Sequence, residues 1–216
     1  STDIAKQNEV AFLRSQIKPH FLFNTLSAIS SLCSTDSRTA KMLIIELSKF
    51  LRGSFLFDNL LVKIPFGEEL SLIRSYVEIE KARFGDQLKV EYVLKDTAHL
   101  QIPPLILQPI VENAIRHGIR KKRNGGTVTI TAVLLQNEYS IEVCDDGIGM
   151  DEQMAENISQ HIRQSNSGVG LINIDKRLME IYHTRLRIES CKGKGTRIGF
   201  KIPLEGGSSF ESNDYR

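Results

Sequence analysis

The sequence has few of the residues that mark secreted, zinc-binding or nucleic-acid-binding proteins. Its 216 residues include three cysteines, Cys33, Cys144 and Cys191, and the formal net charge is only +2. An odd number of widely spaced cysteines without a CxxC pair argues against a disulfide framework or a metal site, so we expect buried thiols in a reducing compartment. The small net charge gives no case for binding nucleic acid or an anionic membrane.

Long apolar runs and several common motifs are also missing. No segment is apolar enough to cross a bilayer, and no signal peptide opens the chain. The chain begins at Ser1 without a methionine, which fits a fragment of something longer, and we expect the fragment to be cytoplasmic. The absence of GxxxxGK[ST], of GxGxxG after a first strand and of a serine nucleophile elbow disfavours P-loop, Rossmann and serine-hydrolase folds.

One imidazole near the start of the chain stands in an unusual local sequence. Residues 13–24 carry a stripe of side chains at helical spacing, and His20 lies at its edge. Pro19 directly before it predicts a local bend in the helix. A lone histidine in such a place is most often a core or interface residue. The residues that form the stripe are Leu13, Ile17, Phe21 and Asn24.

The first quarter of the chain predicts a helical hairpin. Apolar periodicity indicates one helix over residues 4–32 and a second over 38–57, with capping residues at 34–37 between them. A short turn between helices of similar length favours an antiparallel pair. Because two amphipathic helices bury little apolar surface alone, we expect a second copy to complete a four-helix bundle in a homodimer.

The rest of the chain predicts an α+β fold in which helices cover one face of a mixed sheet. A boundary with proline and glycine at residues 58–67 precedes it. Residues 151–167 are polar and are expected to have little order, and residues 207–216 are expected to be a disordered tail. The expected helices are 68–85, 105–117 and 170–182, and the expected strands are 88–94, 128–134, 139–143, 186–190 and 196–202.

The first of four short motifs that suit a nucleotide site is Glu112-Asn113. A carboxamide oxygen is a suitable ligand for Mg²⁺, which also keeps water and phosphate ligands. Arg116, three residues later, lies on the same helical face and is placed to reach a phosphate. Taken alone, an asparagine on a helix is usually a surface residue.

The second motif, Asp145-x-Gly147-x-Gly149, follows a predicted strand. Glycines let the backbone approach a flat ligand closely. A carboxylate accepts a hydrogen bond from the adenine amino group and repels the guanine oxo group, so Asp145 would select ATP over GTP. The alternative is an ordinary turn.

The third and fourth motifs are glycine pairs. Gly168-x-Gly170 opens a helix, whose free N–H groups bind phosphate, and Gly193-x-Gly195-Thr196 precedes the last strand. Each is equally common in ordinary loops. The order and spacing of all four motifs make the combination specific.

Together the four motifs resemble the N, G1, G2 and G3 boxes of the GHKL ATPase superfamily. Residues 13–24 are similar to the phospho-acceptor helix of LytS/YehU-type sensor histidine kinases. Residues 66–85 and 103–114 resemble segments that come later in the sequences of that family. The likeness runs from about Phe12 to Leu204. It implies a dimerisation and phospho-acceptor hairpin at 1–62, followed by a catalytic ATP-binding domain at 63–206.

The resemblance implies that His20 takes the γ-phosphoryl group of Mg-ATP and passes it to an aspartate of a response regulator. It places Asp145 on the adenine, supported by Thr196, and makes Asn113 the Mg²⁺ ligand. It implies no nucleic-acid partner and no membrane contact from this fragment, although the full-length protein would be membrane-bound. The other implied nucleotide contacts are Arg116, His117, Gly147, Gly149, Gly168 and Gly170.

Some points depart from the family or stay open. Better-known histidine kinases carry an acidic residue directly after the phospho-acceptor, where this chain has Phe21, so the candidate base is Glu112. Asn24 either orients the His20 ring or a hydrolytic water, or makes an interface hydrogen bond. Two other classes stay possible: a GHKL-type ATPase or adenine-nucleotide switch without histidine transfer, and a non-enzymatic dimerisation module. No role is assigned to His99, His161 or His183.

Overall fold

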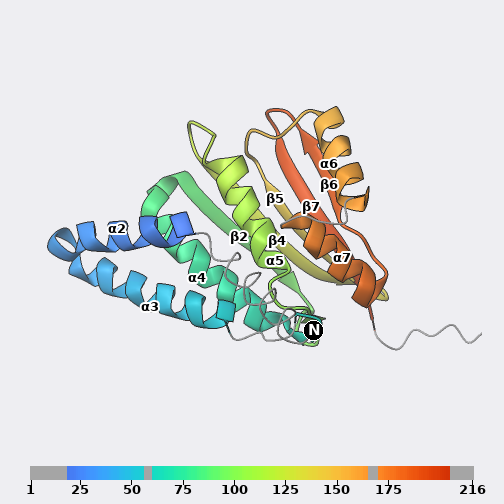
Figure 1. Cartoon of the computed structure of the whole chain (residues 1–216), viewed down its shortest axis with the longest axis horizontal. Helices are drawn as coiled ribbons and strands as arrows, with labels where there is room; N and C mark the ends of the chain where they lie inside the picture. Colours follow the sequence, from blue (N-terminus) through green and yellow to red (C-terminus); the bar gives the residue numbers. More distant parts are fainter. Residues whose placement is uncertain (1–18, 56–59, 165–169, 205–216) are drawn as a thin grey trace, which may run out of the picture.

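The computed structural model describes residues 19–55, 60–164 and 170–204 (Figure 1). The elements follow in the order α2 (Pro19–Thr35), α3 (Ser37–Phe55), β1 (Ile64–Pro65), α4 (Phe66–Phe84), η1 (Gly85–Gln87), β2 (Leu88–Lys95), β3 (Gln101–Ile102), α5 (Leu107–Asn113), η2 (Ala114–Ile119), β4 (Gly126–Leu135), β5 (Glu138–Asp145), α6 (Glu152–Gln164), α7 (Leu171–Tyr182), β6 (Arg187–Cys191) and β7 (Gly195–Pro203).

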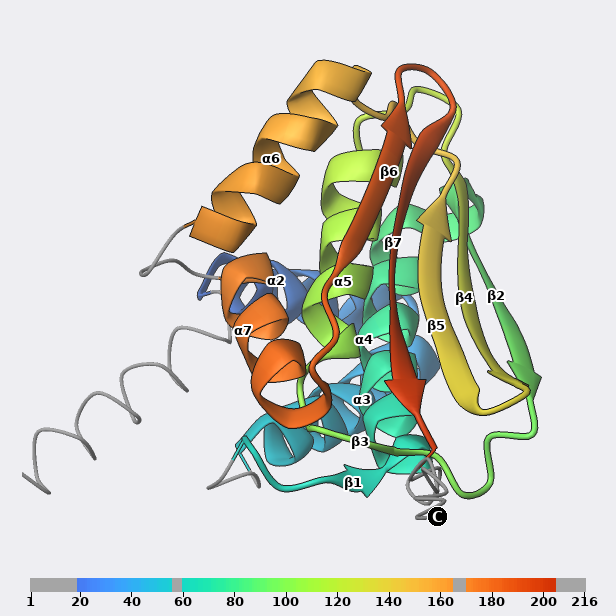
Figure 2. The same ribbon diagram turned by 90° about the vertical axis from the view of Figure 1, so that its right-hand side faces the viewer.

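A five-stranded mixed sheet forms one layer, and the helices lie on one of its faces (Figure 2). The strand order is β2-β4-β5-β7-β6, in which β2 and β4 are parallel and all other neighbours are antiparallel. Along β4, Val128, Ile130 and Ala132 are buried, and the residues between them are partly exposed. This is the period of two that the sequence indicated, and the predicted α+β fold with a mixed sheet is confirmed.

Helices α2 and α3 form a hairpin whose turn is built around Asp36. The Asp36 carboxylate accepts hydrogen bonds from the backbone N–H of Thr39 at 3.1 Å and from its hydroxyl at 2.5 Å, which caps the start of α3. The hydroxyl and N–H of Thr39 hold the pKa of Asp36 below its ordinary value. The part of the first predicted helix before residue 19 lies outside the described residues.

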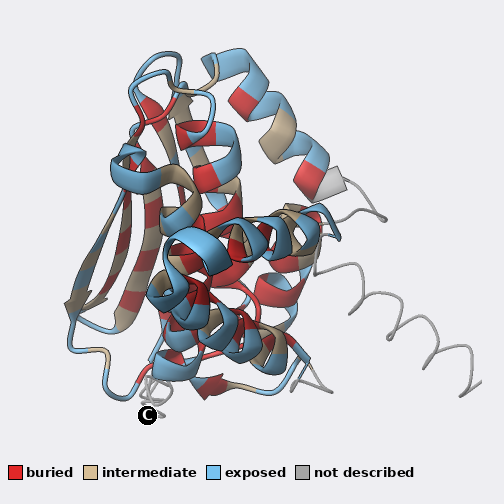
Figure 3. Ribbon diagram, turned by 90° about the vertical axis from the view of Figure 1, so that its left-hand side faces the viewer, coloured by how far each residue is buried: buried red, intermediate tan, exposed pale blue. Residues whose placement is uncertain are grey.

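The hairpin packs against α4 with its inner side and leaves its outer side exposed (Figure 3). The ring of Phe21 lies 5.2 Å from those of both Phe50 and Tyr76, measured between centroids. The hydroxyl of Ser75 on α4 donates a hydrogen bond to Oε2 of Glu46 on α3 at 2.7 Å. The apolar core therefore runs continuously from the hairpin into the α/β layer, and the boundary between residues 62 and 63 stays a prediction.

A fully buried carboxylate of α4, that of Glu69, satisfies the start of α5. The first turn of a helix leaves backbone N–H groups without partners. Here Glu69 accepts two of these and one more from Leu105, just before the helix, and Pro109 has no N–H to satisfy. A negative charge is also favoured at this positive end of the helix. The three donors are Leu105 at 2.7 Å, Leu107 at 2.9 Å and Gln108 at 3.1 Å.

Helix α5 continues into a π-helix, η2, over Ala114–Ile119. Such widened turns are rare and occur frequently at functional sites. In this chain the widened turn brings Gly118 against the Asp145 carboxylate at the end of β5. The helix predicted over 105–117 is therefore present but shifted by two residues, and its last turn is not α-helical.

Two sequence-based expectations are wrong. Residues 152–164 form α6 rather than a stretch of low order, because Ala155, Ile158 and Ile162 make one apolar stripe that is buried or half-buried. That stripe is too sparse to stand out in a polar sequence. The three thiols are free but not buried: Cys33 and Cys191 are exposed and Cys144 is intermediate. Within the described ranges, no helix has the length and apolarity to cross a bilayer.

Candidate nucleotide-binding site

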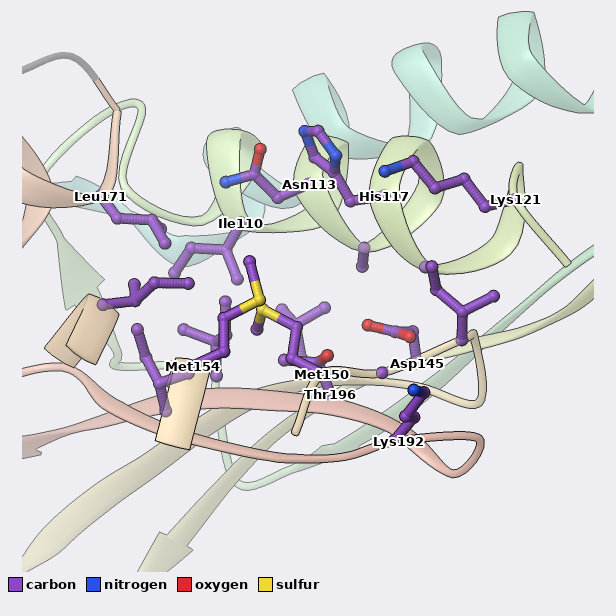
Figure 4. A pocket seen from close by; sticks show the side chains of 18 of the residues that line it. Ile110, Asn113, His117, Lys121, Asp145, Met150, Met154, Leu171, Lys192 and Thr196 are labelled. Atoms are coloured by element: carbon purple, nitrogen blue, oxygen red, sulfur yellow. The ribbon is translucent and has the colours of Figure 1, made fainter. Parts of the chain in front are cut away.

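A cavity of about 530 Å³ lies between α5–η2 and the ends of strands β5, β6 and β7, with α6 along one side (Figure 4). Most of its wall is apolar, and a few polar side chains project into it. An apolar slot with a small number of placed polar groups suits a flat heterocycle. The polar lining residues are Asn113, His117, Lys121, Asp145, Asp151, Lys192 and Thr196.

Asp145 is the last residue of β5, and its carboxylate points into the cavity (Figure 4). The residue is 9% exposed, and its Oδ1 accepts a hydrogen bond from the backbone N–H of Gly147 at 2.9 Å. Burial raises the pKa of Asp145 above its ordinary value of 3.8, although the backbone N–H groups of Gly147 and Thr196 oppose this shift. A carboxylate held in an apolar recess by few partners is ready to accept from a ligand.

Glycine is required where the motif loops touch one another. A Cβ on Gly118 would overlap the Asp145 carboxylate, and one on Gly147 would overlap the backbone of Gly118. Gly149 has a φ of +60°, and a Cβ there would overlap the carbonyl of Cys191. These glycines therefore let η2 and the two loops close around Asp145.

Thr196 faces Asp145 across the β5–β7 pair and lines the cavity. Its hydroxyl lies 2.9 Å from that of Ser190, which donates to the carbonyl of Gly195 at 3.0 Å and accepts from the N–H of Met150 at 2.8 Å. Ser190 thus ties together the loop after β5 and the start of β7. Sequence reasoning missed it, because nothing in a strand marks one serine among others.

A second cavity, of about 580 Å³, also reaches Asn113, so that this residue lines both cavities. Arg116 lies on the same wall, and Gly170 lies at the start of α7. On the α6 side the lining includes Asn157 and His161, although the sequence suggested no role for this histidine. Gly168 lies outside the described residues. The second cavity therefore combines groups that suit phosphate oxygens.

Arg116 and His117 contact each other. Arg116 Nε donates to Nε2 of His117 at 3.2 Å, and an Nη of the same guanidinium lies 2.8 Å from that nitrogen. The Nε2 atom must be unprotonated to accept, so the imidazole is neutral in this arrangement. Both side chains are exposed, and each lines one of the two cavities.

Glu112 is buried and faces α4. Its Oε1 accepts from Nε2 of Gln108 at 3.0 Å, and it is not among the described residues that line either cavity. Burial, followed by the carboxylates of Glu80 and Glu112, raises the pKa of Tyr76 on α4. The geometry therefore separates Glu112 from its neighbour Asn113.

His20 is exposed in the first turn of α2. The carboxamide nitrogen of Asn24 lies 2.9 Å from Nδ1 and 3.2 Å from Nε2 of its ring. Phe21, the next residue, packs inward instead. A core position for this histidine is thereby excluded in the described chain, and Asn24 has the contact that orienting the ring would need.

The comparisons with known proteins agree with this geometry. Residues 8–88 match the family described as "Histidine kinase", and residues 103–206 match "Histidine kinase-, DNA gyrase B-, and HSP90-like ATPase". A putative uncharacterized protein of Bacillus subtilis, YwpD, is 42% identical over 93% of this chain and 72% of its own length. The sensor protein LytS of Bacillus cereus is 35% identical over 92% of this chain. The chain belongs to the LytS-type family of sensor histidine kinases.

The chain spans about a third of the length of LytS, 34% by alignment. Among solved structures, the histidine kinase domain of the Erythrobacter litoralis blue-light activated histidine kinase matches with a TM-score of 0.50. The match covers 94% of this chain and 96% of that domain at 20% identity, so it shows a shared fold.

The histidine-kinase fold gathers most of the predicted site residues. Gly147 packs against Gly118 and donates to the Asp145 carboxylate, whereas Glu112 and His20 lie outside both cavities. The structure also adds Gly118, Lys121, Lys192 and His161, of which Gly118 has a sequence signal, since it directly follows the N-box residues. The predicted residues that line the cavities are Asn113, Arg116, His117, Asp145, Gly149, Gly170 and Thr196.

We predict that Gly118→Ala weakens ATP binding, because the added methyl group would displace the Asp145 carboxylate. The loss of one well-placed hydrogen bond costs roughly 1–3 kcal/mol, which is about 5- to 150-fold in affinity. Calorimetric titration with ATP measures it. The matched control is Gly67→Ala on α4, where an added Cβ meets nothing within 4 Å; its affinity should be unchanged. Equal affinities in the two variants would contradict the packing argument.

A second prediction concerns Asp145→Asn. The folded-state pKa of Asp145 lies above its ordinary value of 3.8, so the ionised carboxylate costs stability at pH 7, and this cost disappears as the pH falls below 3.8. The variant cannot ionise and keeps an oxygen for the Gly147 N–H. It should therefore be more stable than the parent at pH 7, with the difference shrinking as the pH falls, while losing most ATP affinity.

Denaturant unfolding of both proteins between pH 4 and pH 8, together with ATP titration, measures these two effects. A variant that is less stable at pH 7 but binds ATP as tightly as the parent would remove Asp145 from the site.

Proposed function

We propose that this chain is a histidine kinase core that binds Mg-ATP, phosphorylates His20 and passes the phosphoryl group to an aspartate of a response regulator. The observation that carries the proposal is the Asp145 carboxylate, which points into a largely apolar cavity. Asn113 also lines the neighbouring cavity, where Arg116 and His161 lie. The exposure of His20 supports the second half of the proposal.

The two cavities suit the two ends of ATP. Asp145 would accept from the adenine amino group, and Thr196 would support that contact. The triphosphate would extend past Asn113 toward Arg116 and the start of α7, where backbone N–H groups bind anions well. The glycines of the loops keep the backbone close to the nucleotide.

Asn113 is the residue proposed to hold Mg²⁺. Within the described ranges, no three His, Cys, Asp or Glu side chains gather closely enough to hold a metal. Mg²⁺ commonly takes one or two protein oxygens and completes its coordination shell with phosphate oxygens and water. The single carboxamide oxygen of Asn113 is therefore enough protein ligand. When bound, it would neutralise charge on the transferring phosphate.

The transfer needs a nucleophilic nitrogen on His20. A neutral imidazole attacks the γ-phosphorus, an N–P bond forms, the bond to the β–γ bridging oxygen breaks, and ADP leaves with the electron pair. The ring proton passes to water, because His20 is exposed. If the Asn24 carboxamide is turned so that its oxygen accepts from Nδ1–H, then Nε2 keeps its lone pair.

Glu112 does not fit the role of general base in this arrangement. Its carboxylate is engaged by Gln108 and turned toward α4, so we assign it to holding α5. Phosphoryl transfer requires little proton removal in its transition state, and most of the rate enhancement comes from positioning and charge neutralisation. A dedicated base beside His20 is therefore unnecessary.

The apolar outer side of the hairpin supports a homodimer. Large apolar side chains on α2 and α3 are exposed, which is unusual for helices that meet only water. A second copy placed on this side would complete a four-helix bundle from residues 1–62 of each chain. The exposed residues are Phe23, Leu26, Met42, Ile44, Ile45 and Phe55.

The phosphotransfer prediction is tested with His20→Gln and γ-labelled ATP. The parent should acquire a label that is lost in acid and kept in base, and the variant should acquire none. Because His20 is exposed and lies outside both cavities, the variant should bind ATP as the parent does. A label retained in His20→Gln, or ATP hydrolysis without any protein label, would favour an ATPase without histidine transfer.

The homodimer prediction is tested with Phe23→Glu. The side chain of Phe23 is 70% exposed, so the substitution should leave the fold intact and place a charge in the bundle interface. Light scattering after gel filtration should change from dimer to monomer. Val93→Glu, at a residue that is 48% exposed on the sheet, is the control and should stay dimeric. Dissociation in neither variant would refute this interface.

A further inference from the structure

One buried guanidinium joins three segments that are far apart in the sequence. Arg177 lies on α7 and is only 8% exposed. Its Nη2 donates to the carbonyl of Leu60 at 2.7 Å and to the carbonyl of Pro104 at 2.5 Å. Its Nη1 makes a longer contact, of 3.5 Å, with the carbonyl of Leu105. The side chain thus ties α7 to the loop before α5 and to the segment that precedes β1.

The charge of Arg177 is balanced by Glu69 on the far side of the same loop. Arg177 opposes the upward shift that burial causes in the pKa of Glu69, and burial lowers the pKa of Arg177 to about 10. The guanidinium therefore remains protonated at neutral pH. Residues 104–108 are held from one side by a carboxylate on their N–H groups and from the other by a guanidinium on their carbonyls.

Each segment that Arg177 holds leads to a different part of the proposed reaction. The loop before α5 leads to Asn113, and α7 begins beside Gly170 in the second cavity. Leu60 follows α3 in the chain, and α3 packs against α2, the helix that carries His20. Arg177 itself lines neither cavity.

We propose that Arg177 is a positioning residue for phosphoryl transfer, which it serves by fixing Leu60, in the segment that follows the hairpin, relative to the nucleotide site. The inference rests on the proposed function and deepens it. It separates two quantities: ATP binding depends on the cavities, whereas transfer also depends on where the hairpin presents His20. Loss of the Arg177 fork should therefore slow transfer more than it weakens binding.

The test uses Arg177→Lys, which keeps the positive charge beside Glu69 but not the planar fork that reaches two carbonyls. ATP affinity should stay within about threefold of the parent. The rate of His20 labelling at saturating ATP should fall about ten- to a hundredfold, the size expected when reacting groups are slightly misplaced. Arg177→Met leaves Glu69 without its cation and is the variant at risk of misfolding.

The matched control is Arg185→Lys. Arg185 also binds α7, through Oδ2 of Asp175 at 2.7 Å, but this ion pair involves neither Leu60 nor the loop before α5. It should keep both affinity and rate within about twofold. An equal loss of rate in the two variants, a loss of affinity and rate in the same proportion in Arg177→Lys, or no loss in it at all would each overturn the inference.

A second readout does not need activity. Spin labels on Lys41→Cys in α3 and Lys89→Cys in β2, in a background with the three native cysteines replaced by serine, report the distance between hairpin and sheet. With labelled protein diluted into unlabelled protein, Arg177→Lys should broaden a narrow distribution. An unchanged distance distribution would overturn the inference, whether or not the parent shows kinase activity. A parent without kinase activity would refute only the proposed function.

Discussion

A single buried carboxylate, that of Glu69, sets how the helical layer meets the nucleotide site. Moving such a group out of water costs several kcal/mol unless charge and hydrogen bonds compensate. Three backbone N–H groups at the start of α5 and the nearby Arg177 guanidinium provide that compensation. The same contacts lock α4, against which the hairpin packs, to α5, which ends at Asn113. The placement of the proposed metal ligand therefore depends on a residue that never touches the nucleotide.

Asp145 shows the opposite use of the same chemistry. It too is buried with a raised pKa, which the backbone N–H groups of Gly147 and Thr196 oppose. Its carboxylate, however, faces a cavity rather than packed protein. Glu69 is satisfied by the fold, whereas Asp145 keeps capacity for a ligand. The comparison explains why burial alone does not identify a functional carboxylate; the space in front of it does.

Local patterns account for what the sequence could predict. Alternation along β4 and β5 and the glycines after Asp145 are short-range features, so the sheet, the hairpin and a carboxylate at the end of β5 could be predicted from them. The contact of that carboxylate with adenine stays a prediction. Contacts made at long range did not: the donors to Glu69 lie 36 to 39 residues away, and Arg177 reaches back 117 residues to Leu60. Helix α6 was missed because its apolar stripe is sparse. The thiols were wrongly expected to be buried, because Cys144 and Cys191 lie at outward-facing positions of their strands.

The pair His20-Phe21 shows how neighbouring residues divide the two tasks of the hairpin. In the first turn of a helix, adjacent side chains point about 100° apart, so one can pack while the other stays in water. Phe21 uses its position to contact Phe50 and Tyr76, which anchors α2 on α3 and α4. An acidic residue at that position could not make this contact without burying a charge. The anchoring of α2 and the absence of an acidic side chain directly after His20 are thus two consequences of one residue, Phe21.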